Sequence, residues 1–274
     1  MAEITMETDW GAKGAQLTGA QVQKFIKDQL KALQDKDASL QEQITNLNSD
    51  LGDQNPQLQA ATDGCFVTYH RKSDNFPLAV PYWKWPNIEK SGEKADGVLV
   101  LIDGQAPIIV SPTETNLKWS KNAVAVDASV GGDYNKAYVD YSGKTRTAAI
   151  IAKGTELFGE EEENWNQYAA GWCNKYDRTY DKGDEEHTKI GIGAGKWWLP
   201  SIAELITIWK HKYAINLCLS VISGAKQLTE SWYWSSTEPS AAYAWHVALS
   251  DGGLGGWDAK VSYSGCVRAV AAFH

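Results

Sequence analysis

Three short segments in the last third of the chain decide the expected fold: Trp198-Leu199-Pro200-Ser201, Tyr233-Trp234-Ser235-Ser236-Thr237-Glu238 and Val267-Arg268-Ala269-Val270. Ser201 stands three residues before Glu204, which is the spacing of a capping box, and this predicts that a helix begins there. Aromatic and β-branched residues are frequent in the other two segments, and such residues favour strands. We therefore expect a helix followed by short strands, the last of them over 267–273.

Further strands are predicted on both sides of the capping box. Gly64–Tyr69 and Gly97–Ile102 are apolar runs of strand length. Asp103-Gly104 follows the second run and precedes Ile108–Val110, an arrangement typical of a β-hairpin. Near the end of the chain, Tyr243–Leu249 alternates around Trp245 and predicts another strand.

Two apolar stripes predict helices, because their members recur at the spacing of one helical face. The first stripe consists of Trp165, Tyr168, Ala169, Trp172 and Tyr176, and the second of Ile202, Leu205, Ile206, Trp209 and Tyr213. A short helix is expected over about 215–222, while 145–151 fits either a helix or an extended segment. A hairpin, two helices and several short strands in this order predict an α+β domain.

The first 56 residues have a different character. Apolar side chains recur there in steps of four and three, with Asp37 as the one polar member: Ile26, Leu30, Leu33, Leu40, Ile44, Leu47 and Leu51. This heptad pattern, which follows a possible capping box at Thr18 and Gln21, is typical of a coiled coil, where a polar core position can set the register. We expect a short parallel coiled coil, most simply a trimer. The alternative is an amphipathic helix that packs on its own domain.

The composition excludes several classes of partner. The net charge is −8 and the pI is near 5.2. Nucleic-acid and anionic-membrane binding both require basic patches, so neither is expected. No apolar run approaches the ~18 residues of a membrane span, and no secretory signal precedes the first helix, so we expect synthesis in a bacterial cytoplasm. The 13 Trp residues suit a binding surface, although any single one is more often a core residue.

The residues that could hold a metal or a cofactor are poorly arranged. The four cysteines are far apart and form no C-x-x-C pair, so no zinc site is predicted. Cys173 and Cys218 are expected to be small buried residues within helices. Glu160–Glu163 and Asp184–His187 are expected to be solvated acidic loops rather than metal ligands. No cofactor is expected.

Residues 63–273 resemble the C-type-lectin-fold variable proteins of diversity-generating retroelements, above all those of gut Bacteroides-type phages. Six short motifs, in order, carry this resemblance: Gly97–Val100, Gly143–Ala148, Tyr168–Cys173, Trp198–Ser201, Tyr233–Glu238 and Val267–Val270. Trp10–Gly14, followed by a helix, is similar to the start of phage tail-tip adhesins. The resemblance implies a C-type lectin fold over 63–274 behind an oligomerisation segment over 1–56.

The resemblance also implies where the binding surface lies. In these proteins, the stretch between the WSSTE-like segment and the VRAV-like strand is diversified, here about 231–266. Miscopied AAY codons cannot give Trp, Lys, Glu, Gln or Met, and only Trp257 and Lys260 of residues 246–266 belong to that set. Trp234, Trp245, Arg268 and Val270 would be scaffold. The candidate ligand-binding residues, with Trp257 either an anchor or a scaffold residue, are Pro239, His246, Ala248, Asp251, Leu254, Gly255, Gly256, Trp257, Asp258, Ala259, Ser262, Ser264, Gly265 and Cys266. Cys266 is expected to be exposed.

Other functions fit less well. Glu238-Pro239-Ser240 resembles the sugar-and-calcium motif of animal C-type lectins, but Ser240 stands where a second amide ligand would be needed. A formylglycine-generating-type oxidase would need a copper-binding cysteine pair, for which Cys218 and Cys266 are poorly placed. No G-x-S-x-G or H-E-x-x-H motif is present. A structural virion subunit with fixed contacts remains an alternative. We expect a homotrimeric, virion-associated adhesin without catalytic residues that binds a cell-surface protein or glycan.

Overall fold

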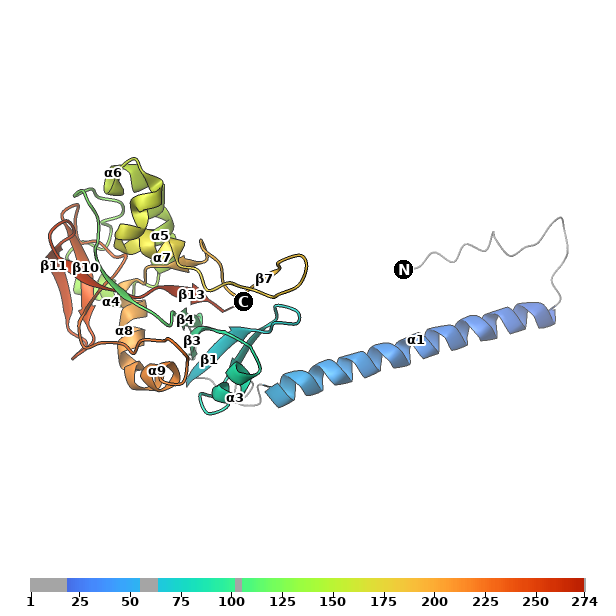
Figure 1. Cartoon of the computed structure of the whole chain (residues 1–274). Helices are drawn as coiled ribbons and strands as arrows, with labels where there is room; N and C mark the ends of the chain where they lie inside the picture. Colours follow the sequence, from blue (N-terminus) through green and yellow to red (C-terminus); the bar gives the residue numbers. More distant parts are fainter. Residues whose placement is uncertain (1–18, 55–63, 102–104, 274) are drawn as a thin grey trace. The chain divides into compact units, whose positions relative to one another are not determined.

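The structure is a computed structural model, and it describes residues 19–54, 64–101 and 105–273 (Figure 1). The chain divides into two compact units, Met1–Asp53 and Gln54–His274, and each is described by itself. The expected capping residue Thr18, the adhesin-like start Trp10–Gly14 and the expected Asp103-Gly104 turn lie outside the described residues.

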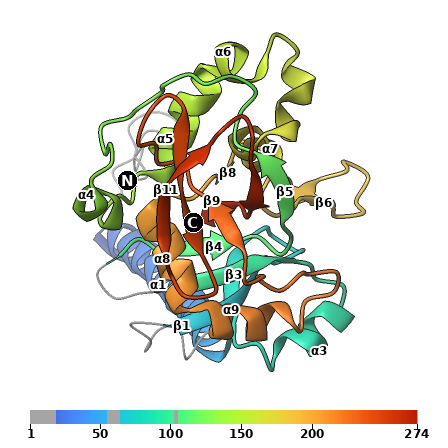
Figure 2. The same ribbon diagram turned by 90° about the vertical axis from the view of Figure 1, so that its left-hand side faces the viewer.

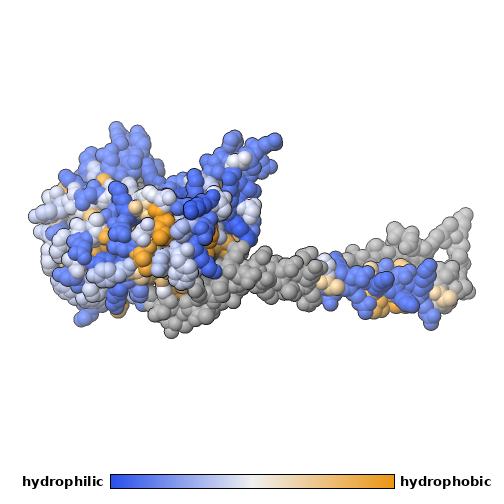
Figure 3. Space-filling view, turned by 60° about the horizontal axis from the view of Figure 1, so that its bottom comes forward, coloured by the Kyte–Doolittle hydropathy of each residue, from blue (hydrophilic) through white to orange (hydrophobic). Residues whose placement is uncertain are grey.

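The first unit is built on one helix, α1, which spans Gly19–Gln54 and has 36 residues. The heptad side chains Ile26, Leu30, Leu33 and Leu40 are 52%, 53%, 64% and 49% exposed. Figure 3 shows hydrophobic patches on this helix between strongly hydrophilic ones. The heptad residues beyond Leu40 lie outside the described side chains. A continuous helix over the heptad region is therefore confirmed, and its described apolar stripe is open to solvent.

The second unit contains a six-stranded sheet in which every described pair is antiparallel. Its strand order is β2-β1-β3-β4-β13-β8, with bounds β1 Gly64–His70, β2 Pro77–Val80, β3 Ala95–Leu101, β4 Ile108–Val110, β8 Trp197–Trp198 and β13 Val270–Ala272. Leu99 lies opposite Ile109, which confirms the predicted hairpin of β3 and β4. The central strands read as apolar runs because their side chains are buried, as in β3 and β4.

A five-stranded sheet forms the other side of this unit. Its order is β11-β10-β9-β12-β5, with bounds β5 Thr115–Lys118, β9 Trp232–Trp234, β10 Tyr243–Ala248, β11 Leu254–Ala259 and β12 Ser264–Val267. The pairs are antiparallel except that of β12 with β9, which is parallel. Figure 2 turns this side of the unit toward the viewer. A two-stranded ladder, β6 Tyr180–Asp181 and β7 Lys189–Ile190, completes the described strands.

Short helices cover the sheets. α5, α6 and α7 gather at one end of the unit, and α8 and α9 lie at the other (Figure 1). α9 packs against β1 and β3, α8 against β10, and both α5 and α7 against β8. The bounds are α3 Trp85–Lys90, α4 Tyr134–Tyr138, α5 Gly143–Ala152, α6 Gly154–Phe158, η1 Glu162–Gln167, α7 Ala169–Lys175, α8 Ile202–Lys210 and α9 Lys212–Leu219. This mixed architecture confirms the predicted α+β class.

α8 begins where the capping box predicts it. The Glu204 carboxylate accepts a hydrogen bond from the backbone N–H of Ser201 at 2.8 Å, so an N-terminal donor of the helix region is satisfied. Ile202, Leu205 and Ile206 are buried, as expected. The placement of Tyr213 on the same stripe is wrong: α8 ends at Lys210, and Tyr213 is an 80% exposed residue of α9.

Two other predicted elements are corrected. The stripe from Trp165 to Tyr176 belongs to two helices, η1 and α7, because Tyr168 between them has extended backbone angles (φ −126°, ψ 154°). The closing strand also breaks in two, since β12 and β13 belong to different sheets. Buried Arg268 lies at the crossing and donates to the carbonyl oxygens of Ser111 and Lys226 at 2.8 and 2.9 Å. These bonds hold the chain between the sheets.

Candidate ligand-binding site

Strands β9, β10, β11 and β12 line a cavity of about 300 Å³ in the five-stranded sheet. These are the red and orange strands that face the viewer in Figure 2. The lining residues are Trp232, Trp234, His246, Asp258, Tyr263, Ser264 and Gly265. The cavity therefore lies within the stretch 231–266 that the sequence analysis singled out.

Strand pairing brings the aromatic residues and the histidine together. His246 on β10 lies opposite Trp234 on β9 and opposite Gly255 on β11. Trp232 shares a face of β9 with Trp234 because side chains of a strand alternate with a period of two. A Cβ atom on Gly255 would lie 2.2 Å from Nε2 of His246, so the absence of a side chain there lets the imidazole lie against β11.

The lining residues form a buried floor and an exposed rim. Trp234 and His246 are 2% and 5% exposed, and Trp234 donates through Nε1 to the carbonyl oxygen of Leu117 at 3.0 Å. Trp232 and Tyr263 are 49% and 58% exposed. The rim thus presents large aromatic side chains to solvent above a floor whose rings are held by the sheet.

One ionisable pair lies in the cavity. Nδ1 of His246 is 3.2 Å from a carboxylate oxygen of Asp258. Burial lowers the pKa of His246, and the negative charge of Asp258 opposes this shift. Because the ordinary histidine pKa is about 6.5, the lowered value leaves the imidazole neutral at pH 7. Asp258 is then the charged group of the lining.

A buried ion pair supports the segment between β11 and β12. Nζ of Lys260 bonds to a carboxylate oxygen of Glu238, and the two side chains are 0% and 1% exposed. Lys260 also donates to the carbonyl oxygen of Val124 at 3.0 Å and lies 4.4 Å from the centre of the Trp119 ring. The other oxygen of Glu238 accepts from the backbone N–H of Asp127 at 2.7 Å. The pair fixes this segment to 119–127.

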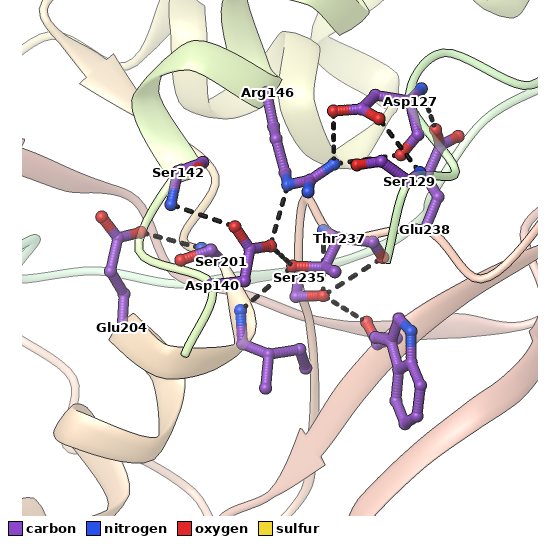
Figure 4. Close-up of polar contacts among 12 residues, drawn as sticks. Asp127, Ser129, Asp140, Ser142, Arg146, Ser201, Glu204, Ser235, Thr237 and Glu238 are labelled. Carbon is purple, nitrogen blue, oxygen red and sulfur yellow. Dashed lines mark hydrogen bonds and ion pairs between the residues drawn. The ribbon is translucent and has the colours of Figure 1, made fainter. Parts of the chain in front are cut away.

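A second polar cluster continues from this pair through the WSSTE segment (Figure 4). Asp140 accepts hydrogen bonds from Nε of Arg146 at 2.8 Å and from the hydroxyl of Thr237 at 2.7 Å. Arg146 also donates through Nη1 to the carboxylate and the carbonyl oxygen of Asp127 at 2.9 and 3.0 Å. Buried polar groups that are hydrogen-bonded in this way rigidify their surroundings. Thr237 and Glu238 of the WSSTE segment are therefore held in place by buried hydrogen bonds.

The structure separates the candidate binding residues into groups by exposure. The cavity brings together four of them: His246, Asp258, Ser264 and Gly265. Exposed or half-buried outside the cavity lining are Pro239, Asp251, Leu254, Gly255, Trp257, Ala259 and Ser262. Trp257 is 63% exposed, with its ring 5.9 Å from that of Tyr243, so it is a surface residue rather than a core scaffold residue.

Three candidates are wrong as surface-lining residues. Ala248 and Cys266 are 3% and 8% exposed: Ala248 lies opposite Trp232 on β9, and the Cys266 thiol lies 3.6 Å from the Thr229 hydroxyl. Gly256 is buried, and a Cβ atom there would lie 3.0 Å from the Trp245 ring, so this position faces the core. The expectation of an exposed Cys266 thiol is wrong for the same reason.

Three residues of the cavity were not among the candidates: Trp232, Trp234 and Tyr263. Trp234 was predicted to be a scaffold residue. It is buried, as a scaffold residue would be, and it also lines the floor of the cavity. The alternation of Trp232 and Trp234 in a strand would have placed both rings on one face. Tyr263 carries no such pattern, since it lies in a turn whose position depends on the pairing of β12 with β5.

The described residues contain no group of three or more side chains suited to hold a metal ion. The carboxylate of Glu238, the first residue of the calcium-like motif, forms an ion pair with Lys260. Cys173 and Cys218 are buried in α7 and α9, as predicted, and all four cysteines are free thiols. Burial raises the pKa of Cys65 and of Cys218 to about 12, so neither is a thiolate at pH 7. Glu160–Glu163 is an exposed acidic segment, as expected.

Comparisons with known proteins leave the family open. No protein-family model matches the chain, and no curated protein matches it. Among solved structures, a fimbrial protein from Bacteroides ovatus ATCC 8483 is similar to this chain with 17% identity and a TM-score of 0.38. The likeness covers 60% of this chain and 35% of the fimbrial protein. Among the described residues, no helix has the length and apolarity needed to cross a membrane.

Proposed function

We propose that this protein binds a receptor, a protein or a glycan, on a target cell through the surface formed by residues 231–266. The observation that carries the proposal is the cavity in that stretch, which exposed Trp232 and Tyr263 line together with the Asp258 carboxylate and the buried Trp234. Aromatic side chains with a few polar groups are typical of binding hot spots. Recognition would rest on shape and polarity, without a covalent step.

We further propose that the second unit has a C-type lectin fold and belongs to the variable proteins of diversity-generating retroelements. The six motifs in their order support this proposal. A buried polar support beneath an exposed rim suits a surface whose side chains change while the fold persists. Lys260, which miscopied AAY codons cannot encode, is buried and paired with Glu238, as a fixed support would be.

We also propose that α1 assembles the protein into a homotrimer through a parallel coiled coil. Exposed apolar residues at successive heptad positions of a long helix favour a partner helix over solvent. Several copies of a weak site on one particle increase the effective affinity for a cell surface. A phage tail tip or a host adhesin would both use this arrangement.

Deep sequencing of the 3′ end of the gene, in a population that carries it, tests the diversification. We expect substitutions at NNY codons within 231–266 and a flat background elsewhere, with the codon of Lys260 constant. The codons for 119–127, which support the same surface from outside the stretch, serve as an internal control. An invariant 3′ end would contradict diversification and favour a fixed-specificity virion subunit.

Light scattering of the full chain tests the assembly. We expect the mass of a trimer, and dissociation when Leu33 and Leu40 are both replaced by Asp. The matched control is Lys31→Asp, which changes an exposed position away from the heptad seam of the same helix and should leave the mass unchanged. A monomeric full chain, or a trimer that survives deletion of residues 1–55, would contradict the coiled coil.

A further inference from the structure

The cavity of β9–β12 has a chemistry that specifies one class of ligand more closely than the proposed receptor-binding function does. We propose that it binds the guanidinium group of an arginine side chain on a protein receptor. This inference rests on the proposed function for its biological setting, while the cavity and its chemistry stand independently of it.

The lining of the cavity contains an acidic side chain and no basic one of the lysine or arginine type. Asp258 is the one carboxylate among the seven lining residues, and none of the seven is a lysine or an arginine. Its close neighbour is His246, whose buried ring is neutral at pH 7 and gives it no opposite charge. The nearby Lys260 is buried in its pair with Glu238 and does not line the cavity. Asp258 thus provides a negative site open to a cation.

The rim of the cavity is aromatic. Trp232 and Tyr263 are about half exposed on the cavity rim, and Trp234 lies at its floor. The faces of indole and phenol rings attract cations, and Trp attracts them most strongly. The ring of Trp232 is kept in place by a perpendicular contact with His246, with 4.3 Å between the ring centres. A planar cation can therefore stack on a ring whose orientation is already determined.

Size and geometry favour arginine over other ligands. A volume of about 300 Å³ accommodates one side chain but not an extended glycan. A guanidinium group is planar, pairs with a carboxylate through two parallel hydrogen bonds and stacks on aromatic rings, which a lysine ammonium group does less well. A neutral sugar would cover Asp258 without supplying an opposite charge, and an uncompensated carboxylate disfavours that complex.

The preference belongs to this particular sequence of the surface. Asp258 and His246 are both positions that we propose to be diversified, and both residues are within the reach of NNY codons. A relative with a different residue at 258 would keep the aromatic floor of Trp234 and lose the preference for a cation. The inference thus predicts which single position sets the charge of the ligand.

An NMR titration of the full chain tests the proposal. With ¹⁵N-labelled tryptophan, the indole N–H signal of Trp232, assigned from a Trp232→Phe variant, is followed as N-acetyl-arginine methylamide is added. We expect a saturable shift with a Kd in the millimolar range. The uncharged isostere N-acetyl-citrulline methylamide should bind at least tenfold more weakly to the same unmodified protein, and methyl glycosides should leave the signal unchanged.

Variants locate the charge. Asp258→Asn should weaken binding of the arginine probe at least tenfold, whereas Glu160→Gln, which removes an exposed carboxylate outside residues 231–266, should leave it unchanged. Equal affinity for the arginine and citrulline probes, a shift caused by a glycoside alone, or no shift at all would each overturn the proposal. An invariant 3′ end combined with arginine binding would instead overturn diversification and leave the cavity assignment intact.

Discussion

The buried pair of Lys260 and Glu238 allows a sharp test of how the binding surface is supported. Replacing Lys260 by Met keeps most of the side-chain volume but leaves the Glu238 carboxylate, 1% exposed, without its opposite charge. Breaking a buried ion pair from one side typically costs about 3–5 kcal/mol. Glu238 retains its hydrogen bonds from the backbone of Val126 and Asp127, so we expect a loss near the lower end, about 3 kcal/mol.

The assay is urea unfolding followed by tryptophan fluorescence, with the slope of the transition checked for constancy. The double variant Glu238→Gln with Lys260→Met should lose less than Lys260→Met alone, because no buried charge remains, and the double-mutant cycle gives the coupling between the two side chains. The matched control is Lys118→Met, an exposed lysine on β5, which should change stability by less than about 0.5 kcal/mol. A loss below about 1 kcal/mol for Lys260→Met would refute the reasoning.

Two further predictions concern other buried positions. Burial raises the pKa of Glu204 from 4.5 to about 7. Between these two pH values the folded state keeps a proton that the unfolded state loses. The free energy of unfolding of the unmodified protein therefore falls as the pH rises from 4.5 to 7. The difference in unfolding free energy between Glu204→Gln and the unmodified protein should therefore change with pH. Between pH 4.5 and pH 8, urea unfolding should show this difference moving in favour of the variant by about 3 kcal/mol, at about 1.4 kcal/mol per pKa unit. The same difference at both pH values would contradict the raised pKa of Glu204. Gly255→Ala should cost about 1–3 kcal/mol, because its Cβ atom would meet the His246 ring, whereas the control Gly193→Ala places its Cβ atom at an ordinary 3.5 Å from Thr179.

Local patterns were sufficient where a single element decides its own structure. The start of α8 follows from the capping-box spacing of Ser201 and Glu204, because the Glu204 side chain accepts from the backbone N–H three residues before it. The heptad pattern predicted the continuous helix α1 in the same way. The hairpin of β3 and β4 was predictable because two apolar runs flank a turn pair.

Long-range contacts decided the elements that were wrong. The stripe from Trp165 to Tyr176 has helical spacing, but the extended backbone of Tyr168, whose ring stacks on Phe158 at 5.2 Å, divides it into two helices. Arg268 looked like a residue within one closing strand. Its bonds to Ser111, Lys226 and Glu114 hold the chain where it crosses between sheets, and no local pattern announces such partners.

The cavity lies within the stretch that the resemblance implied, but its lining differs from the predicted residues. Cys266 and Ala248 fall within 231–266 and yet are buried, while Trp232 and Tyr263 form the rim of the cavity. Which face of a strand is covered depends on what packs against it. Part of that information comes from the pairing of β12 with β5, which is distant in the sequence.

The sequence by itself determined the α+β class, the long N-terminal helix and the start of α8. These features depend on residue spacing, and spacing is a property of the chain alone. The tertiary structure alone decided that Trp234, His246 and Asp258 meet, and that Lys260 lies buried against Glu238. Such contacts join side chains from separate strands, so their geometry exists only once the sheet has formed.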